Sequence, residues 1–167
     1  MKNVSLNKKG FTLVELLAVI VILALLIVIT ANTVLPMMNK SKKSGMVTYA
    51  ERAVSNATAS YQADSITGGN TGDRYYSIYN LMGARDYFGC VQVVVDNSGA
   101  VPAYTYNVKM FDSKNKYYLE GTVAPGSSTF SETDLNTLVA DYTDDVPTPT
   151  DYDVCSDEDT FDDISAP

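Results

Sequence analysis

The chain has 167 residues, a length that suits one compact domain together with an apolar N-terminal segment. Its formal net charge of −8 disfavours direct binding to nucleic acid, because phosphates repel an acidic surface. The chain contains no histidine, so the usual general base of catalysis and the usual nitrogen ligand of metals are both missing. Most classes of enzyme are therefore disfavoured.

An apolar segment begins close to the N-terminus. Every residue over 16–29 is apolar, and the wider stretch 11–35 is interrupted only at Thr12, Glu15, Thr30, Asn32 and Thr33. This stretch is long enough to span a bilayer as a helix. An ordinary secretory signal is the alternative. It leaves Glu15 unexplained, because a carboxylate inside an apolar segment is costly unless it finds a partner.

A second feature precedes and overlaps this segment: the run Lys8-Lys9-Gly10-Phe11-Thr12-Leu13-Val14-Glu15-Leu16. This run resembles the processing site of type IV prepilins. The resemblance implies that a prepilin peptidase in the membrane cuts between Gly10 and Phe11 and methylates the new N-terminus at Phe11. It is close from Lys8 to about Ile29 and concerns architecture alone beyond that.

Glu15 gains a physical role in this interpretation. An amine created at Phe11 can pair with the Glu15 carboxylate of a neighbouring subunit once both are buried in an apolar bundle. Each charge then offsets the burial cost of the other, and a subunit out of register leaves a carboxylate unpaired. Glu15 is therefore the residue predicted to control assembly.

The helix is expected to continue beyond the apolar segment. Pro36 removes a backbone donor, which predicts a kink or local melting near residues 32–36, unless Pro36 ends the membrane helix outright. Helical spacing then resumes and predicts helix to about Ala63, with an apolar stripe formed by Met46, Tyr49, Ala50, Ala53, Val54, Ala57 and Tyr61.

A cluster of positive charge follows the apolar run directly, at Lys40, Lys42 and Lys43. Its position suits a membrane interface. These lysines balance Lys2, Lys8 and Lys9 on the other side of the segment, so charge alone does not set the orientation of the chain in a membrane. The resemblance to prepilins implies that the C-terminal part folds outside the cell.

The rest of the chain predicts a small antiparallel sheet. Residues 90–96 alternate in polarity, and a turn at 97–99 leads to a second strand over 104–110. A turn at 113–115 then leads to a third strand over 117–123. The apolar face of such a three-stranded meander needs a cover, which the stripe on the helix can provide.

Less regular structure surrounds these strands. The glycine-rich run 67–72 favours a loop, and a short helix is expected over 76–82. Ser131, with Asp134 three positions later, is expected to cap another short helix that ends near Ala140. The twelve tyrosines are better explained by packing in strands than by a sugar-binding surface.

Cys90 and Cys155 lie far apart, which fits no close-spaced zinc or redox signature. They form either a disulfide, which would hold the acidic tail on the domain, or two free thiols. No cofactor is expected. Carboxylates in the tail are weak candidates for calcium ligands, but a solvated tail is favoured because no EF-hand spacing is present; these candidates are Asp151, Asp153, Asp157 and Asp159.

Together these features predict an α+β chain with a type IV pilin-like fold, in which a long N-terminal helix packs on a small antiparallel sheet. The expected parts are a leader at 1–10, a transmembrane or filament-core helix at 11–36, an amphipathic continuation at 37–64, a globular domain at 65–140 and an acidic tail at 141–167.

The resemblance implies a structural subunit of a type IV pilus. Such a subunit enters the cytoplasmic membrane as a single-pass prepilin and then joins a helical filament of identical subunits at the cell surface. The implied partners are prepilin peptidase, a membrane platform protein and assembly ATPases, and the implied roles are adhesion, motility and DNA uptake. A minor pilin or a pseudopilin of a secretion or competence system is the alternative. An enzyme or receptor on an uncleaved anchor is least favoured.

Overall fold

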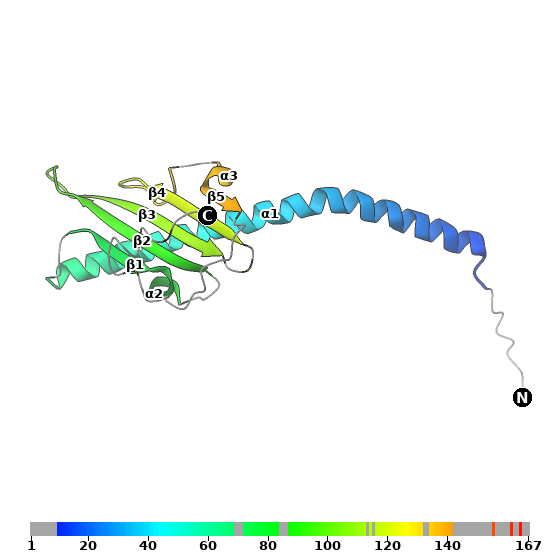
Figure 1. The fold of residues 1–167 in the computed structure, drawn as a ribbon, viewed down its shortest axis with the longest axis horizontal. Coiled ribbons are helices and arrows are strands. Elements are labelled where there is room, and N and C mark those ends of the chain that lie inside the picture. The colour runs from blue at the N-terminus through cyan, green and yellow to red at the C-terminus, as the bar shows by residue number, and fades with distance from the viewer. Residues whose placement is uncertain are drawn as a thin grey trace, which may run out of the picture. The chain divides into compact units, whose positions relative to one another are not determined.

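The structure is a computed structural model that describes residues 10–68, 72–83, 87–112, 114, 116–131, 134–141, 155, 161 and 164. The chain divides into two compact units, Met1–Asn39 and Lys40–Pro167. The first unit contains the N-terminal part of helix α1 (Leu13–Ile66), and the second contains the rest of α1 and the sheet (Figure 1).

Helix α1 is continuous over 54 residues and includes Pro36 in its interior. Residues 32–36 are helical, so the predicted local melting is wrong, and Pro36 does not end the helix. A proline removes a single N–H donor, and the hydrogen bonds of the flanking turns are enough to keep the helix intact here. A change of helix direction at Pro36 stays a prediction.

The second unit contains a five-stranded antiparallel sheet with the strand order β1-β2-β3-β4-β5. The three predicted strands form its centre, and a short strand flanks them on each side. The bounds are β1 Arg74–Ser77, β2 Tyr87–Asp96, β3 Ala103–Asp112, β4 Tyr117–Val123 and β5 Val139–Asp141.

Helix α2 (Ile78–Met82) is shorter than predicted. Tyr76 and Ser77, expected in this helix, belong instead to β1, where they pair with Val91 and Cys90 of β2. Gly83 ends the helix in a left-handed conformation, and its N–H donates to the carbonyl of Tyr79 at 2.7 Å.

The expected helix after Ser131 is a single turn, α3 (Leu135–Leu138). Asp134 is its cap, because its side chain accepts from the N–H of Asn136 at 3.0 Å. The cap prediction for Ser131 is wrong, since its hydroxyl donates to the carbonyl of Thr122 at 2.9 Å. The helix stops before Ala140 because Val139 pairs with Leu119 of β4 and starts β5.

The core of the second unit lies between the predicted stripe of α1 and the inner face of the sheet. Six residues of the stripe are buried, and Tyr49 packs against them. Alternation along the strands supplies the opposite wall, which includes Val91, Val93, Val108, Met110 and Leu119. Burial of each such large side chain contributes roughly 1.5–3 kcal/mol to folding.

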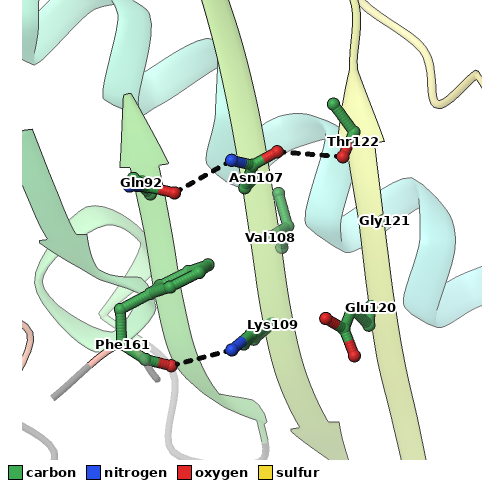
Figure 2. Close-up of a pocket in the computed structure, with 8 residues that line it drawn as sticks. All are labelled: Gln92, Asn107, Val108, Lys109, Glu120, Gly121, Thr122 and Phe161. Atoms are coloured by element: carbon green, nitrogen blue, oxygen red, sulfur yellow. Dashed lines mark hydrogen bonds between the residues drawn. The ribbon is translucent and has the colours of Figure 1, made fainter. Parts of the chain in front are cut away.

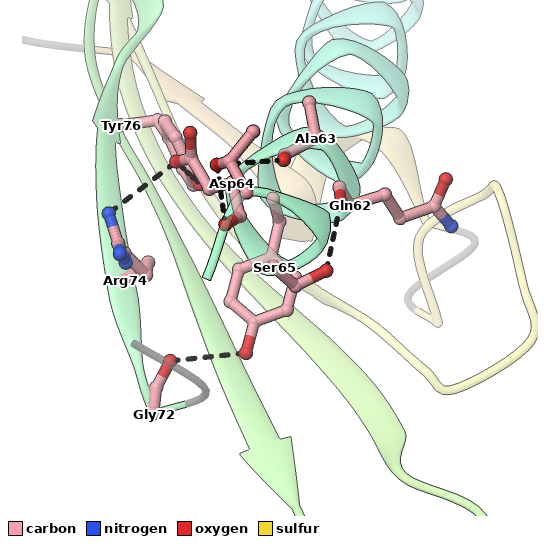
Figure 3. A network of polar contacts seen from close by, with 9 residues as sticks. Gln62, Ala63, Asp64, Ser65, Gly72, Arg74 and Tyr76 are labelled. Atoms are coloured by element: carbon pink, nitrogen blue, oxygen red, sulfur yellow. Dashed lines mark hydrogen bonds and ion pairs between the residues drawn. The ribbon is translucent and has the colours of Figure 1, made fainter. Parts of the chain in front are cut away.

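A polar network fixes the C-terminal end of α1 against β1 (Figure 3). The Asp64 carboxylate accepts from the Tyr76 hydroxyl at 3.1 Å and forms an ion pair with Arg74 at 3.4 Å. Burial first, and then the hydrogen bond to Asp64, raises the pKa of Tyr76 to about 12. The hydroxyl of Tyr61, in the last turns of α1, donates to the carbonyl of Gly72 in the loop after the helix at 3.3 Å.

The outer face of the sheet has an aromatic half. Phe88, Phe111 and Tyr118 lie on three neighbouring strands. The rings of Phe88 and Phe111 stack with centroids 5.2 Å apart, and the tilted ring of Tyr118 lies 4.8 Å from that of Phe111. Ile164 of the C-terminal tail packs against this aromatic cluster and also against a second cluster, in which Phe161 and Cys155 are buried with Cys90. The two cysteines form a disulfide, with Cα atoms 5.8 Å apart.

Candidate functional site

The predicted processing bond lies just before α1. Gly10, Phe11 and Thr12 are not helical, and Phe11 is 89% exposed. A Cβ atom built on Gly10 meets no atom within 4 Å, and the residue is not in the left-handed region. The fold itself therefore does not require glycine at this position, so a requirement for glycine would come from an enzyme that recognises the bond.

Thr12 and Glu15 form a capping box at the start of α1. One oxygen of Glu15, Oε2, accepts from the backbone N–H and from the hydroxyl of Thr12, both at 2.9 Å. In return, the Thr12 hydroxyl oxygen accepts from the N–H of Glu15 at 3.3 Å. Two backbone donors that a helix start leaves without partners are thereby satisfied.

This geometry holds the Glu15 carboxylate at the N-terminal end of the helix. The helix dipole places partial positive charge there, which favours a carboxylate. The bond between Gly10 and Phe11 is one residue before the cap, so cleavage would create an amine next to this carboxylate. The other oxygen of Glu15, Oε1, takes no part in the capping box and is available to a partner.

Glu15 is the single charged residue over 11–39. The large apolar side chains around it are exposed over the whole segment, and α1 is long and apolar enough, by length and composition, to cross a membrane. The hydroxyls of Thr30 and Thr33 donate to carbonyls one turn earlier in the helix, at 2.9 and 3.2 Å. The polarity of these two hydroxyls is therefore satisfied within the helix, whereas Glu15 carries a full charge.

The comparison with known families falls on this same segment. The family described as Prokaryotic N-terminal methylation motif matches residues 5–31. The chain carries the signature of type IV prepilin-like proteins. The match includes Gly10, Phe11 and Glu15, and this motif points to a structural protein. Searches among curated proteins and among solved structures found no match.

The basic cluster after the apolar segment is only partly exposed. Lys40 and Lys42 are exposed, but Lys43 is 8% exposed and its ammonium lies 3.2 Å from the Asp141 carboxylate. The same ammonium lies 5.3 Å from the centroid of the Tyr117 ring. Lys43 therefore joins α1 to β4 and β5 and does not offer its charge to a membrane interface, in contrast to the prediction.

The remaining predicted site residues concern the tail. Cys90 and Cys155 are joined and buried, so neither is a free thiol. Across the part of the chain that the structure describes, no three His, Cys, Asp or Glu side chains gather in a way that could hold a metal ion. The calcium candidates lie outside the described residues, so that site stays a prediction; they are Asp151, Asp153, Asp157 and Asp159.

Sequence reasoning missed the role of Thr12, which orients Glu15. The signal was present, because Thr-x-x-Glu before an apolar run is the pattern of a capping box. The structure adds that Glu15 already has hydrogen bonds within its own chain.

Proposed function

We propose that the chain is made as a prepilin, cut between Gly10 and Phe11, methylated at Phe11 and assembled through its N-terminal helix into a surface filament. The observation that carries this proposal is the exposed apolar segment 11–39, whose single charged residue, Glu15, is held at the start of α1 within a methylation motif. The chain would be a structural subunit with no catalytic chemistry of its own.

Two features of the segment suit this sequence of events. The bond after Gly10 lies in non-helical, exposed chain, as cleavage by a peptidase requires. The apolar side chains of α1 can hold the prepilin in the cytoplasmic membrane and later pack with other copies. A platform protein and assembly ATPases would move the subunit between these two environments.

Glu15 would set the register of assembly. An amine at Phe11 of one subunit and the Glu15 carboxylate of another neutralise each other when both leave water. The capping box keeps the carboxylate at the end of the helix before the partner arrives, which reduces the ordering needed at that moment. A subunit displaced along the filament would bury this charge without a partner.

A minor pilin or a pseudopilin of a secretion or competence system would use the same leader and the same helix. Abundance separates these proteins from a major pilin, because a major subunit dominates the material sheared from cells. Adhesion, motility and DNA uptake are roles that the filament would serve.

The experiment that tests the role of Glu15 is the variant Glu15→Gln in the native cells. Glutamine also completes a capping box, so this variant retains the helix start and removes only the charge. We expect normal removal of the leader and a yield of sheared filaments reduced by more than about tenfold. Glu51→Gln, the same change in the second unit, is the matched control and should assemble like the wild type.

Wild-type filament yield from Glu15→Gln would contradict the proposed charge pairing. An equal loss in Glu51→Gln would show that the assay responds to any loss of negative charge on α1. Immunoblots of leader removal in both variants separate a defect in processing from a defect in assembly.

A further inference from the structure

A cavity of about 290 Å³ opens on the outer face of the sheet, on the side away from α1 (Figure 2). Three neighbouring strands form its floor, and the buried ring of Phe161 forms one wall. Most of its lining is polar, and the side chains that face it from the three strands are Gln92, Asn107, Lys109, Glu120 and Thr122.

A row of hydrogen bonds crosses this floor from strand to strand. The Thr122 hydroxyl donates to Asn107 Oδ1 at 2.9 Å, and Asn107 Nδ2 donates to Gln92 Oε1 at 2.9 Å. Gln92 Nε2 then donates to the Tyr75 hydroxyl at 3.1 Å. The row fixes which atom of each amide is the donor and which is the acceptor.

The row leaves hydrogen-bonding capacity for a ligand. An amide carries two N–H donors and an oxygen with two acceptor positions, and Gln92 and Asn107 each use one donor and one acceptor position in this row. Each amide therefore keeps one N–H and at least one acceptor position. Because the row holds the amides in place, a ligand would not have to order them.

Two charged side chains of opposite sign line the cavity. Lys109 of β3 and Glu120 of β4 lie opposite each other in the strand register, but each side chain contacts another group. The Lys109 ammonium lies 3.2 Å from the Phe161 carbonyl oxygen and 4.5 Å from the centroid of its ring. One oxygen of Glu120 accepts from the Tyr118 hydroxyl at 2.9 Å. Among the described residues that line the cavity, one side chain is a cation and one is an anion, which favours a ligand without net charge.

We propose that this cavity binds a neutral hexose or N-acetylhexosamine. Such a sugar carries several neighbouring hydroxyls, each able to donate and accept, which matches the alternating donors and acceptors of the row. Inorganic anions are disfavoured by Glu120 and by the acidic chain. The proposal goes beyond the proposed filament function, because the cavity belongs to the domain and does not depend on processing or assembly.

The test uses the full-length chain in detergent micelles. Saturation-transfer NMR would measure its binding to glucose, galactose, mannose, N-acetylglucosamine and N-acetylgalactosamine, each at about 10 mM to detect millimolar affinities. We expect at least one of these sugars to bind. Thr122→Val should weaken that binding by about tenfold, because it breaks the row and removes a hydroxyl that lines the cavity.

Thr105→Val is the matched control. Thr105 lies two positions before Asn107 on β3, so it faces the same side of the sheet, but it does not line the cavity. Its variant should bind the sugar like the wild type. The proposal would be overturned if none of the five sugars binds, or if both variants weaken sugar binding equally. It would also be overturned if the chain binds glycine or inorganic phosphate in preference to the sugars.

Discussion

The disulfide between Cys90 and Cys155 should supply a large part of the stability of the second unit. The bond joins residues that are 65 positions apart, and its sulfur atoms lie among buried apolar side chains. In the chain-entropy model, closing a loop of this length in the unfolded chain stabilises the fold by about 4 kcal/mol. Reduction of the bond should therefore lower the free energy of unfolding by about that amount.

Urea unfolding of the full-length chain in detergent measures this effect. The near-ultraviolet circular dichroism of the packed tyrosines reports on the second unit. With a denaturant slope of about 2 kcal/mol per molar urea, the midpoint should fall by about 2 M between the oxidised and the reduced wild-type chain. This comparison changes the bond without changing the sequence.

A variant provides the control. Cys155→Ala should unfold at about the same urea concentration as the reduced wild type, and addition of reductant should not shift it further. A midpoint shift below about 0.5 M on reduction of the wild type would refute the reasoning, because the loop would then not constrain the unfolded chain.

Two further predictions concern the sheet and its junction with α1. Gly89 has a φ of +142°, and a Cβ atom there would collide with the Lys109 carbonyl oxygen and lie 2.8 Å from Met110 Cα. Gly89→Ala should thus lower the free energy of unfolding by roughly 3 kcal/mol or more. The control Gly126→Ala, at a φ of +74° in open space, should lower it by only about 1 kcal/mol. Similar urea midpoints for both variants would contradict this prediction. The pKa of Tyr76 is raised from 10.0 to about 12, so the stabilisation linked to its proton is complete below pH 10 and disappears as the pH rises through 12. Urea unfolding over this pH range should show a smaller loss of stability in Tyr76→Phe than in the wild type, and equal losses would contradict the linkage.

The sequence predicted the elements whose signal is local. The stripe from Met46 to Tyr61 has helical spacing, and its buried face is the face that the spacing indicates. The valines of β2 alternate, and their pairing with β3 follows the predicted turn. In both cases a single continuous stretch of sequence contains the pattern that predicts which residues are buried.

The missed elements depend on contacts with distant residues. Arg74–Ser77 carries no alternating apolar pattern and becomes a strand only through pairing with β2. Val139–Asp141 likewise becomes a strand only through pairing with β4, and this pairing ends the predicted helix before Ala140. Lys43 resembles its exposed neighbours in sequence, and only the approach of Asp141 and Tyr117 gives it a buried position.

The candidate site was predicted in part for the same reason. The processing motif is a continuous run of residues, so Gly10, Phe11 and Glu15 could be named directly. The cavity on the outer face could not, because Gln92, Asn107 and Thr122 come from three strands whose register decides that they meet.

The most direct test of the proposed function is intact mass spectrometry, with mapping of the N-terminal peptide, on material sheared from the surface of the native cells. If the chain is processed as proposed, the main species begins at a methylated Phe11 and lacks residues 1–10. A chain that keeps Met1 to Gly10, or that begins near Asn32 after cleavage as a conventional secretory signal, would contradict it.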